Sequence, residues 1–518
     1  MALGYRSVDR DQLFLLPPDV RDWLPEGHLA WFVLDVVERI DTSRLHERHA
    51  NDGAGRRAFD PDMLLALLLY AYCTGQRSSR RIEQLCELDV AFRVICANDA
   101  PDHTTIARFR QLHGEHAAAL FVEVLVLCKE AGLTKVGVVA VDGTKIAADA
   151  SLKVNRTREQ IEKQVAAMMA EAEAVDAAED QLFGDRRGDE LPAELADRGR
   201  RRRRLDEALE QIKAKQAKRD AEQAERDANL DQAIVNGAGM SRRSRKGDDP
   251  VVLAEKRVEY YKRRAERRRA DVEARYRARG RRPSGFAPRQ DYDVTRALKR
   301  LDAARAKAAE RAETTPAAKQ PAKPDRANTT DPDSRIMPTA KGWIQGYNAQ
   351  AAVNENGVVL AAEVTNETND STQCQPMIAA TKRNLRTIRH RQRIGTMLFD
   401  AGYWSEANAT APGPKRLIAT KKSYKLRQQL AEQGPASGPP PQDATPAQAM
   451  EHRLRTRHGA KLYSKRQHTV EPVFGQIKHD RGIRRFTRRG LAAVQAEWQL
   501  ITSAHNLLKL AGSGYTPS

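Results

Sequence analysis

Cysteines are scarce in this sequence, and its N-terminal part lacks long hydrophobic runs. The five cysteines form no Cys-x-x-Cys pair and no cluster with histidines, which argues against a disulfide framework and a zinc site. The first residues lack the apolar core of a signal peptide. The longest apolar run near them, residues 63–72, is too short to span a bilayer. We therefore expect a cytoplasmic protein without a membrane partner.

Positive charge is abundant instead. Of the 518 residues, 30% are charged, and the formal net charge is +19. A chain with this charge attracts polyanions, of which nucleic acid is the usual one. A surface made rich in arginine by the base composition of the source genome is the alternative, and composition alone leaves it open. The length suffices for two or three domains with a sizeable core.

Residues 1–130 are expected to form a helical domain. Apolar residues recur at helical spacing over 31–40. A dense apolar segment follows Pro61, a residue type that often opens a helix. Serines begin a further short helix within residues 77–89.

The last predicted helix of this region, residues 102–113, carries two arginines. Thr104 or Thr105 can cap its start, and Arg108 and Arg110 are expected to face outward and contact DNA. Short helices with such a last member fit a DNA-binding unit of the helix-turn-helix type. They fit an ordinary helical bundle equally well.

Residues 155–326 are expected to form a long basic helical insertion with a linker. Apolar stripes run from Ile161 to Val175 and from Leu205 to Ile212, each flanked by charged faces, as in a helical hairpin or coiled coil. Residues 200–204 are five consecutive arginines, and residues 314–330 have the composition of a flexible linker. The excess of positive charge favours contact with a polyanion over a solvated spacer.

Residues 131–154 and 327–515 are expected to form an α/β core. Four valines before Asp142 predict a buried strand, and a turn at Asp142–Gly143 into a partner strand is a second interpretation. Two strands joined by a turn at 354–357 come next. The remaining predicted elements are a helix at 375–386, a buried strand ending at Asp400, a short strand at 416–421, a Pro-rich segment without fixed structure at 434–446, a helix beginning near Pro472 and a last helix at 490–510.

Two of these strands end in an aspartate, and a late helix carries a glutamate. Taken singly, Asp142 and Asp400 are ordinary residues of a turn, and Glu471 is an ordinary acid in a first helical turn. Together they suggest a site, because two Mg²⁺ ions about 4 Å apart can activate the attacking oxygen and stabilise the leaving oxygen of a phosphodiester reaction. Carboxylates are the hard oxygen ligands that such ions need.

Six motifs in a fixed order carry a resemblance to a known family. They are VAVDGTKIAADAS, DPDSRIMPT, GWIQGYNAQAAV, VTNETND, LFDAGYWSEAN and VEPVFGQIKHDRGIRRFTRRG. Together they resemble the DDE transposases of bacterial insertion sequences. FDPDMLLALLLYAY and DHTTIARFRQLH resemble the N-terminal domain that these proteins carry. The resemblance covers most of the chain outside residues 155–325 and 434–457.

The resemblance implies a ribonuclease H-like core, a mixed sheet flanked by helices. It implies that Asp142, Asp400 and Glu471 are catalytic and hold Mg²⁺, or Mn²⁺ as the alternative. The implied reaction frees a 3′-hydroxyl at the terminal inverted repeats of an element and joins it to target DNA. A homodimer on DNA, near the bacterial nucleoid, is the expected assembly.

The resemblance also implies a Tyr, an Arg and a Lys around the glutamate. Lys478, seven residues after Glu471, returns to the same face of one continuous helix. The step from Arg466 to Glu471 is one residue longer than the family pattern. The predicted DNA contacts of this region are Tyr463, Arg466, Lys478, Arg481, Arg484 and Arg485, with plain surface charge as the alternative.

Other acids and other functions compete with this assignment. Asp331, Asp333 and Asp370 are rival ligands, which we interpret as structural or as supports of the site. A purely hydrolytic nuclease would use the same carboxylates. A DNA-binding or scaffold protein with an inactive core would rely on the basic insertion instead.

Overall fold

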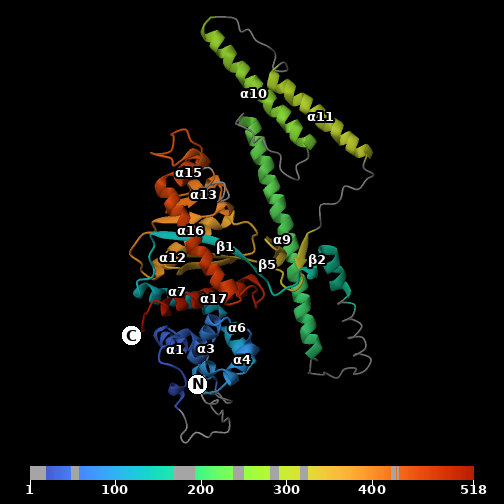
Figure 1. Ribbon diagram of the computed structural model, residues 1–518. Coiled ribbons are helices and arrows are strands. Elements are labelled where there is room, and N and C mark those ends of the chain that lie inside the picture. Colours follow the sequence, from blue (N-terminus) through green and yellow to red (C-terminus); the bar gives the residue numbers. More distant parts are fainter. Residues whose placement is uncertain are drawn as a thin grey trace, which may run out of the picture. The chain divides into compact units, whose positions relative to one another are not determined.

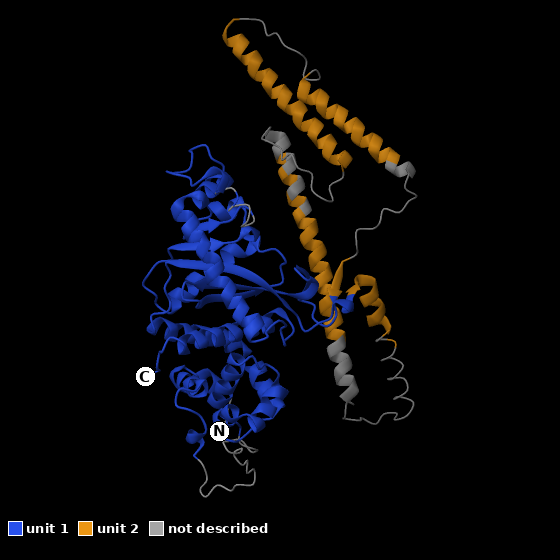
Figure 2. Ribbon diagram, viewed as in Figure 1, with its two compact units in different colours: residues 1–155, 328–518 blue, residues 156–327 orange. Residues whose placement is uncertain are grey.

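The computed structural model of the chain describes residues 19–47, 58–167, 193–236, 250–280, 291–314, 325–421 and 431–517, together with residues 170 and 428. It contains two compact units (Figure 2). The first combines residues 1–155 and 328–518, and the second is formed by residues 156–327. In the part of the chain so described, no helix is long and apolar enough to cross a membrane.

The first unit begins with helices where the apolar spacing predicts them. Asp60 caps α3 just before Pro61, and Asp102 caps α6, whereas Thr104 or Thr105 was expected to do so. The elements are η1 (Val20–Trp23), α1 (Leu29–Arg39), α2 (Ser43–His46), α3 (Pro61–Cys73), α4 (Ser79–Leu88), α5 (Val90–Ile95), α6 (His103–Leu112), η2 (Gly114–His116) and α7 (Ala117–Glu130).

A mixed six-stranded sheet follows (Figure 1). Its strands are β1 (Val138–Ala147), β4 (Arg335–Thr339), β5 (Gly342–Asn354), β6 (Val359–Thr365), β7 (Thr396–Phe399) and β8 (Lys415–Ile418). The central strand β1 pairs antiparallel with β5 and parallel with β7, which pairs parallel with β8. Strands β6 and β4 pair antiparallel with successive parts of the other edge of β5. The chain is therefore a mixed α/β protein, as expected.

β1 runs through Asp142 and Gly143 without a turn, so the interpretation of a turn at this point is wrong. Gly143 pairs with Gln350 of β5, and the strand continues to Ala147. A side chain at position 143 would collide with the Gln350 amide and lie 2.8 Å from Asp370 Oδ1. The glycine therefore marks a close approach of neighbouring side chains within a strand.

Helix α17 (Leu491–Ala511) joins the sheet to the N-terminal helices. Gln495 and Asn506 bond to backbone groups on the outer edge of β6, for example to the Val364 and Val359 amides at 2.6 and 2.8 Å. This capping covers polar groups that an edge strand would otherwise expose. Helices α3 and α7 pack against the same helix. The N-terminal helices and the sheet consequently share one apolar core.

The helix that carries Glu471 begins well before Pro472, so the predicted start near Pro472 is wrong. It is α16 (Arg457–Gly475), and Pro472 lies in its last turn. A proline inside a helix lacks the backbone N–H and therefore removes one bond to the preceding turn. The chain then continues directly into a π-helical turn, η7 (Gln476–Asp480), so the regular α-helical spacing assumed between Glu471 and Lys478 does not hold.

The Pro-rich segment 434–446 has a defined position, contrary to expectation. Ala436 bridges to Thr456, and a capping box at Thr445 opens α15 (Pro446–Arg455). The other elements of this unit are η3 (Leu152–Val154), η5 (Ser371–Gln373), α12 (Cys374–Thr387), η6 (Ala401–Tyr403) and α13 (Glu406–Thr410).

The second unit consists mainly of long charged helices. They are α9 (Ala193–Asn236), α10 (Pro250–Ala278) and α11 (Tyr292–Thr314), with a helix over 158–167 and the paired strands β2 (Asn155–Thr157) and β3 (Arg326–Asn328). Ile161 packs with Leu205 and Ile212, so the described parts of the two apolar stripes contact each other. The later part of the first stripe, residues 171–175, lies outside the described residues.

The tight surroundings of Gly143 predict a loss of stability in Gly143→Ala. A methyl group there must displace side chains between two paired strands, which should cost about 1–3 kcal/mol of unfolding free energy. Gly475→Ala is the control, because the added carbon meets nothing within 4 Å apart from its chain neighbours and the backbone of its own helix. Urea denaturation of both variants measures the effect, and equal stabilities would contradict this account of Gly143.

Candidate active site

The strand register brings two of the predicted acids side by side. Val141 of β1 lies opposite Phe399 of β7, and Asp142 and Asp400 are the next residues along the two strands. Neighbouring strands lie about 4.8 Å apart. Asp142 and Asp400 therefore lie side by side on the two strands, at the point where β7 ends.

Both carboxyl groups are placed where their charge is disfavoured. Burial raises the pKa of Asp142 to about 6; Arg466 opposes this rise, and the Asp400 charge adds to it. Burial also raises the pKa of Asp400, again against Arg466, and Asp370 adds to that rise. Buried acids close to one another are typical of functional sites, and a bound cation would offset their repulsion.

Arg466 of α16 connects two of the predicted carboxylates. Its guanidinium donates a hydrogen bond to Asp142 Oδ2 at 2.9 Å, and its other terminal nitrogen lies 3.6 Å from Glu471 Oε1. The Arg466 side chain is 8% exposed and that of Glu471 is 53% exposed. The buried arginine thus lies between a strand acid and a helix acid, despite the longer step between Arg466 and Glu471.

The three predicted acids lie near Arg466 and are not gathered tightly around one point. In the described ranges, the one group of three His, Cys, Asp or Glu side chains whose ligand atoms all lie within 4.8 Å of one another is elsewhere. Asp142, Asp400 and Glu471 are therefore spaced more widely than this. Such spacing is compatible with two ions, since ligands of different ions need not touch.

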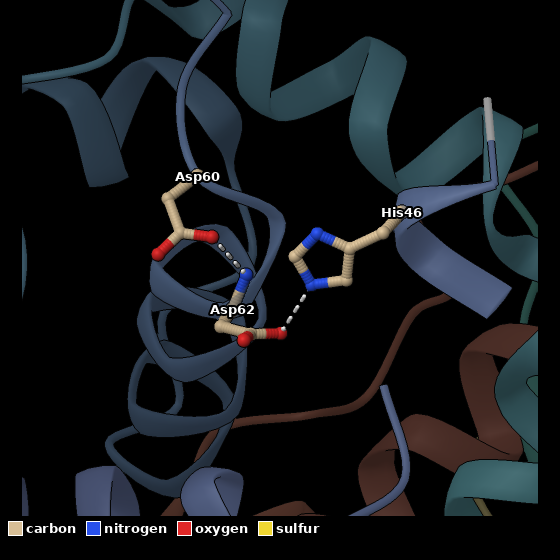
Figure 3. A group of neighbouring side chains, drawn as sticks. All are labelled: His46, Asp60 and Asp62. Atoms are coloured by element: carbon tan, nitrogen blue, oxygen red, sulfur yellow. Dashed lines mark hydrogen bonds and ion pairs between the residues drawn. The ribbon is translucent and has the colours of Figure 1, made fainter. Parts of the chain in front are cut away.

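The compact group is formed by His46, Asp60 and Asp62 (Figure 3). Asp60 caps α3 by accepting a hydrogen bond from the Asp62 amide, and His46 Nε2 lies 3.1 Å from Asp62 Oδ1. The positive end of a helix dipole disfavours a cation at this place. Local structure therefore accounts for the group.

Tyr463 and Lys478 contact the strands on either side of the acids. The Tyr463 hydroxyl donates to the Phe399 carbonyl at 3.3 Å, and burial raises its pKa to about 12. Lys478 Nζ donates to the Lys145 carbonyl at 2.8 Å and to the Thr144 hydroxyl. These two predicted DNA contacts thus connect α16 and η7 to β7 and β1.

The predicted DNA-binding arginines differ in exposure. Arg484 and Arg485 are exposed. Arg481 turns inward, donates to the Ile501 carbonyl at 3.2 Å and has its pKa lowered by burial to about 10. The structure consequently does not offer Arg481 to DNA, contrary to expectation.

The two arginines of α6 differ in the same way. Arg108 is exposed, as expected. Arg110 is half-buried and donates to the Arg77 carbonyl at 2.7 Å and to Ser79 Oγ at 3.4 Å. The expectation that Arg110 faces outward is therefore wrong, because it bonds the start of α4.

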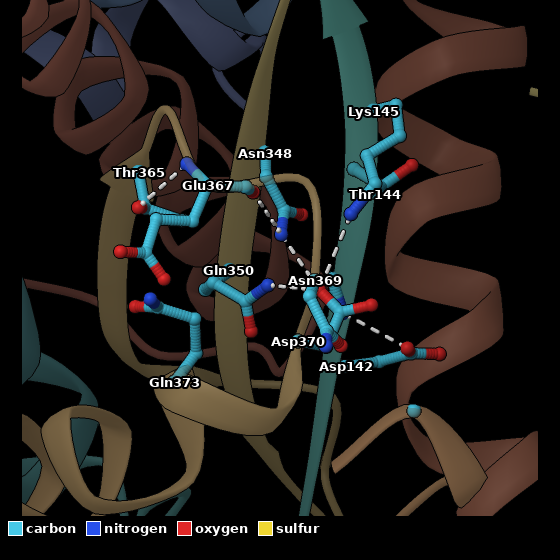
Figure 4. A network of polar contacts seen from close by, with 12 residues as sticks. Asp142, Thr144, Lys145, Asn348, Gln350, Thr365, Glu367, Asn369, Asp370 and Gln373 are labelled. Carbon is cyan, nitrogen blue, oxygen red and sulfur yellow. Dashed lines mark hydrogen bonds and ion pairs between the residues drawn. The ribbon is translucent and has the colours of Figure 1, made fainter. Parts of the chain in front are cut away.

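The rival acids separate into two roles. Asp331 accepts hydrogen bonds from the Tyr347 hydroxyl and the Gly490 amide, and Asp333 accepts one from the Leu491 amide. These contacts fasten the beginning of α17. Asp370 instead lies in a polar network beside β1 (Figure 4).

Sequence reasoning missed the partners of Asp370. Asn348 and Gln350 of β5 are fully buried, and both donate to this carboxylate. The sequence signal for them is two polar residues within an otherwise apolar strand. This pattern indicates a polar site, because buried amides need hydrogen-bond partners.

Two protein families match parts of the chain. Residues 18–112 match a family described as Transposase domain (DUF772), and residues 441–511 match one described as Transposase DDE domain. No curated protein and no solved structure matches. The second segment contains Arg466 and Glu471, whereas Asp142 and Asp400 lie outside both segments.

The raised pKa of Asp142 predicts a pH-dependent gain of stability in Asp142→Asn. The folded state holds the Asp142 proton up to about pH 6, against 3.8 for a free side chain, so this stability is present at low pH and lost as pH rises through 6. Without divalent cations, the variant should exceed the parent by about 1–3 kcal/mol at pH 8 and match it near pH 4.

Urea unfolding at the two pH values measures this difference. Asp480→Asn removes the same charge from a side chain that is 64% exposed, and it should change stability little at either pH. An Asp142→Asn effect of equal size at both pH values would show that its cause is not the carboxyl charge.

Proposed function

The two matched families support an insertion-sequence transposase of the DDE type, and we propose that this chain cuts DNA at the ends of its element and joins them to target DNA. In this proposal Asp142, Asp400 and Glu471 bind divalent cations, with Mg²⁺ as the natural ion and Mn²⁺ as a substitute. The observation that carries it is the contact of buried Arg466 with Asp142 and Glu471, beside Asp400.

The arrangement of the sheet supports a ribonuclease H-like core. Asp142 lies on the central strand, between the antiparallel strand β5 and the parallel strand β7. Asp400 follows that parallel neighbour, and Glu471 lies on a helix that packs against β1. Rigid strand ends and a helix can hold ligands with the accuracy that phosphodiester chemistry requires.

The side chains present fit such cations. The acids offer only hard oxygen atoms, as Mg²⁺ prefers. Gly402 keeps the space beside Asp400 free, because an added carbon at position 402 would lie 3.1 Å from Asp400 Oδ1. When bound, the cations would activate the attacking oxygen and stabilise the leaving oxygen.

Other side chains have separate roles in the proposed reaction. Arg466 pairs with Asp142 and lies 3.6 Å from Glu471 in the structure, and Glu471 would leave it when a cation binds. In the first step water attacks the phosphorus, the P–O3′ bond breaks, and the departing oxygen takes up a proton to give a 3′-hydroxyl and a 5′-phosphate. In the second step this hydroxyl loses its proton and attacks a target phosphorus, and the target P–O3′ bond breaks to release a target 3′-hydroxyl. Exposed Arg484 and Arg485 would hold the phosphates nearby.

DNA would also contact the helical regions. The segment 18–112 would bind the element ends, with Arg108 on its surface, and the basic helices of the second unit would add charge contacts. Two ends need two active sites, so a homodimer on DNA is part of the proposal.

Removal of the proposed ligands predicts loss of cleavage. Asp142→Asn, Asp400→Asn and Glu471→Gln should each slow Mg²⁺-dependent cutting of DNA that carries the element ends by about a thousandfold, since ligand loss removes several kcal/mol of transition-state stabilisation. Asp480→Asn serves as the control. Normal cutting by the Asp142 or Asp400 variant would rule out the assignment.

The products of the same assay separate the candidate functions. Strand-joined molecules are expected from a transposase, and nicks alone would indicate a hydrolytic nuclease. Binding without any metal-dependent cutting would indicate a scaffold protein.

Arg484 and Arg485 are exposed in the loop that follows η7. We expect Arg484→Ala and Arg485→Ala to bind DNA more weakly and with less dependence on salt concentration. Each lost phosphate contact should reduce the slope of log affinity against log salt by about 1. Arg383→Ala, which removes an arginine of α12 that is 63% exposed, is the control. Titrations of labelled DNA at several salt concentrations measure the slope, and an unchanged slope in both variants would exclude the loop as a phosphate contact.

A further inference from the structure

Asp370 lies in the loop between β6 and α12, and its carboxylate is oriented by one of its two oxygens. Oδ1 accepts hydrogen bonds from Asn348 Nδ2 at 2.6 Å, Gln350 Nε2 at 2.9 Å and Lys145 Nζ at 3.3 Å (Figure 4). Asn348 and Gln350 are fully buried, and the side chains of Lys145 and Asp370 are 16% and 22% exposed. Three donors from two strands therefore fix one acid.

The second oxygen of Asp370 faces Asp400. A carbon added at Gly402 would lie 3.1 Å from Asp400 Oδ1 and 3.4 Å from Asp370 Oδ2. The two oxygens thus border the same small space, which the glycine leaves without a side chain. The Gly402 amide donates to Asp400 Oδ1 at 2.9 Å and holds that carboxylate in place.

The surroundings show that the three aspartates share one neighbourhood. Tyr403 is fully buried, and its hydroxyl donates to Gln350 Oε1. Burial raises its pKa, and the charges of Asp370, Asp142 and Asp400 each add to that rise. A buried polar atom without a partner lies beside this network. The Oδ1 atom of Asn348 is buried and has no hydrogen-bond partner among the described residues, and, like Asp370 Oδ1, it lies 2.8 Å from the position of a carbon added at Gly143.

A structural acid elsewhere in the same unit looks different. Glu497 is buried, and both of its oxygens are used: Oε1 accepts from Arg77 and Thr487, and Oε2 accepts from the amides of Thr487 and Arg488. All three hydrogen bonds that the described residues make to the Asp370 carboxylate reach Oδ1. Asp331 is likewise held through Oδ1 alone, so the feature that distinguishes Asp370 is that its second oxygen borders the Asp400 carboxylate.

We propose that Asp370 is a fourth carboxylate of the cation site, and that its Oδ2 binds the divalent cation that Asp400 also binds. Lys145, Asn348 and Gln350 position it for this role. The inference rests on the proposed function, because it requires a cation at Asp142 and Asp400. It goes beyond that function by adding a ligand on the face of β1 that carries Gly143 and Lys145, opposite the face that carries Asp142.

Direct measurement of cation binding tests the proposal. Mn²⁺ binding to the full chain without DNA is followed by electron paramagnetic resonance, for the parent and for Asp370→Asn. The amide keeps the size of the side chain and an acceptor for its three donors, so the fold should persist, which thermal unfolding checks. We expect Mn²⁺ affinity to fall at least about tenfold, and Asp370→Glu to restore part of it.

Matched variants separate the outcomes. Asp480→Asn removes one exposed negative charge and should leave Mn²⁺ affinity unchanged. If Asp370→Asn behaves like this control while Asp142→Asn and Asp400→Asn lose Mn²⁺, Asp370 is not a ligand and the proposed function stands. If none of the three variants changes Mn²⁺ binding, the cation site itself is wrong and both proposals fail. A loss of stability in Asp370→Asn with unchanged affinity would show a purely structural acid.

Discussion

The buried Arg466 guanidinium is the interaction on which the arrangement of the candidate site depends. It crosses from α16 to β1 and pairs with Asp142 at 2.9 Å. Tyr463 and Lys478 add contacts to β7 and β1 on either side of it. Removing the Arg466 side chain would leave Asp142 buried without its cation and cost several kcal/mol. The position of the helix acid relative to the strand acids is therefore set by electrostatics as well as by apolar packing.

This arrangement holds more negative than positive charge. Asp142, Asp400 and Asp370 lie close together: Asp142 and Asp370 are on opposite faces of β1, and Asp400 follows the end of β7. Arg466 is paired with Asp142, and Lys145 is paired with Asp370. A fold selected for stability alone would avoid such a group, because burial of like charges is unfavourable. Sites that must bind a cation accept this cost in the free state.

Strand patterns and the family motifs predicted part of this site. The apolar runs before Asp142 and Asp400 indicated strands that lead to these acids. The register of β1 and β7 places the two acids side by side, although β1 continues past Asp142 to Ala147. The start of α16 was missed because residues 457–470 are mostly polar and Pro472 resembles a helix opening. The Asp370 network could not be predicted, since it depends on which residues of β5 lie opposite β1. The exposure of single side chains could not be predicted either: Arg481 was expected to contact DNA, but it turns inward and donates to the Ile501 carbonyl.

The two family matches lie at opposite ends of the sequence, yet the fold unites them. Arg77, just before α4, donates to the Arg485 carbonyl at 2.6 Å and pairs with Glu497 of α17 at 3.0 Å. Glu497 in turn binds the amides of Thr487 and Arg488, so the basic loop after η7 is fastened to the N-terminal helices. The same loop bridges to the end of β1 at Ala147. A DNA end held by the N-terminal helices would therefore reach Asp142 at a distance set by packed and hydrogen-bonded elements. Position-specific cutting needs this kind of fixed distance, because the scissile phosphate is then selected by geometry even where no base is contacted.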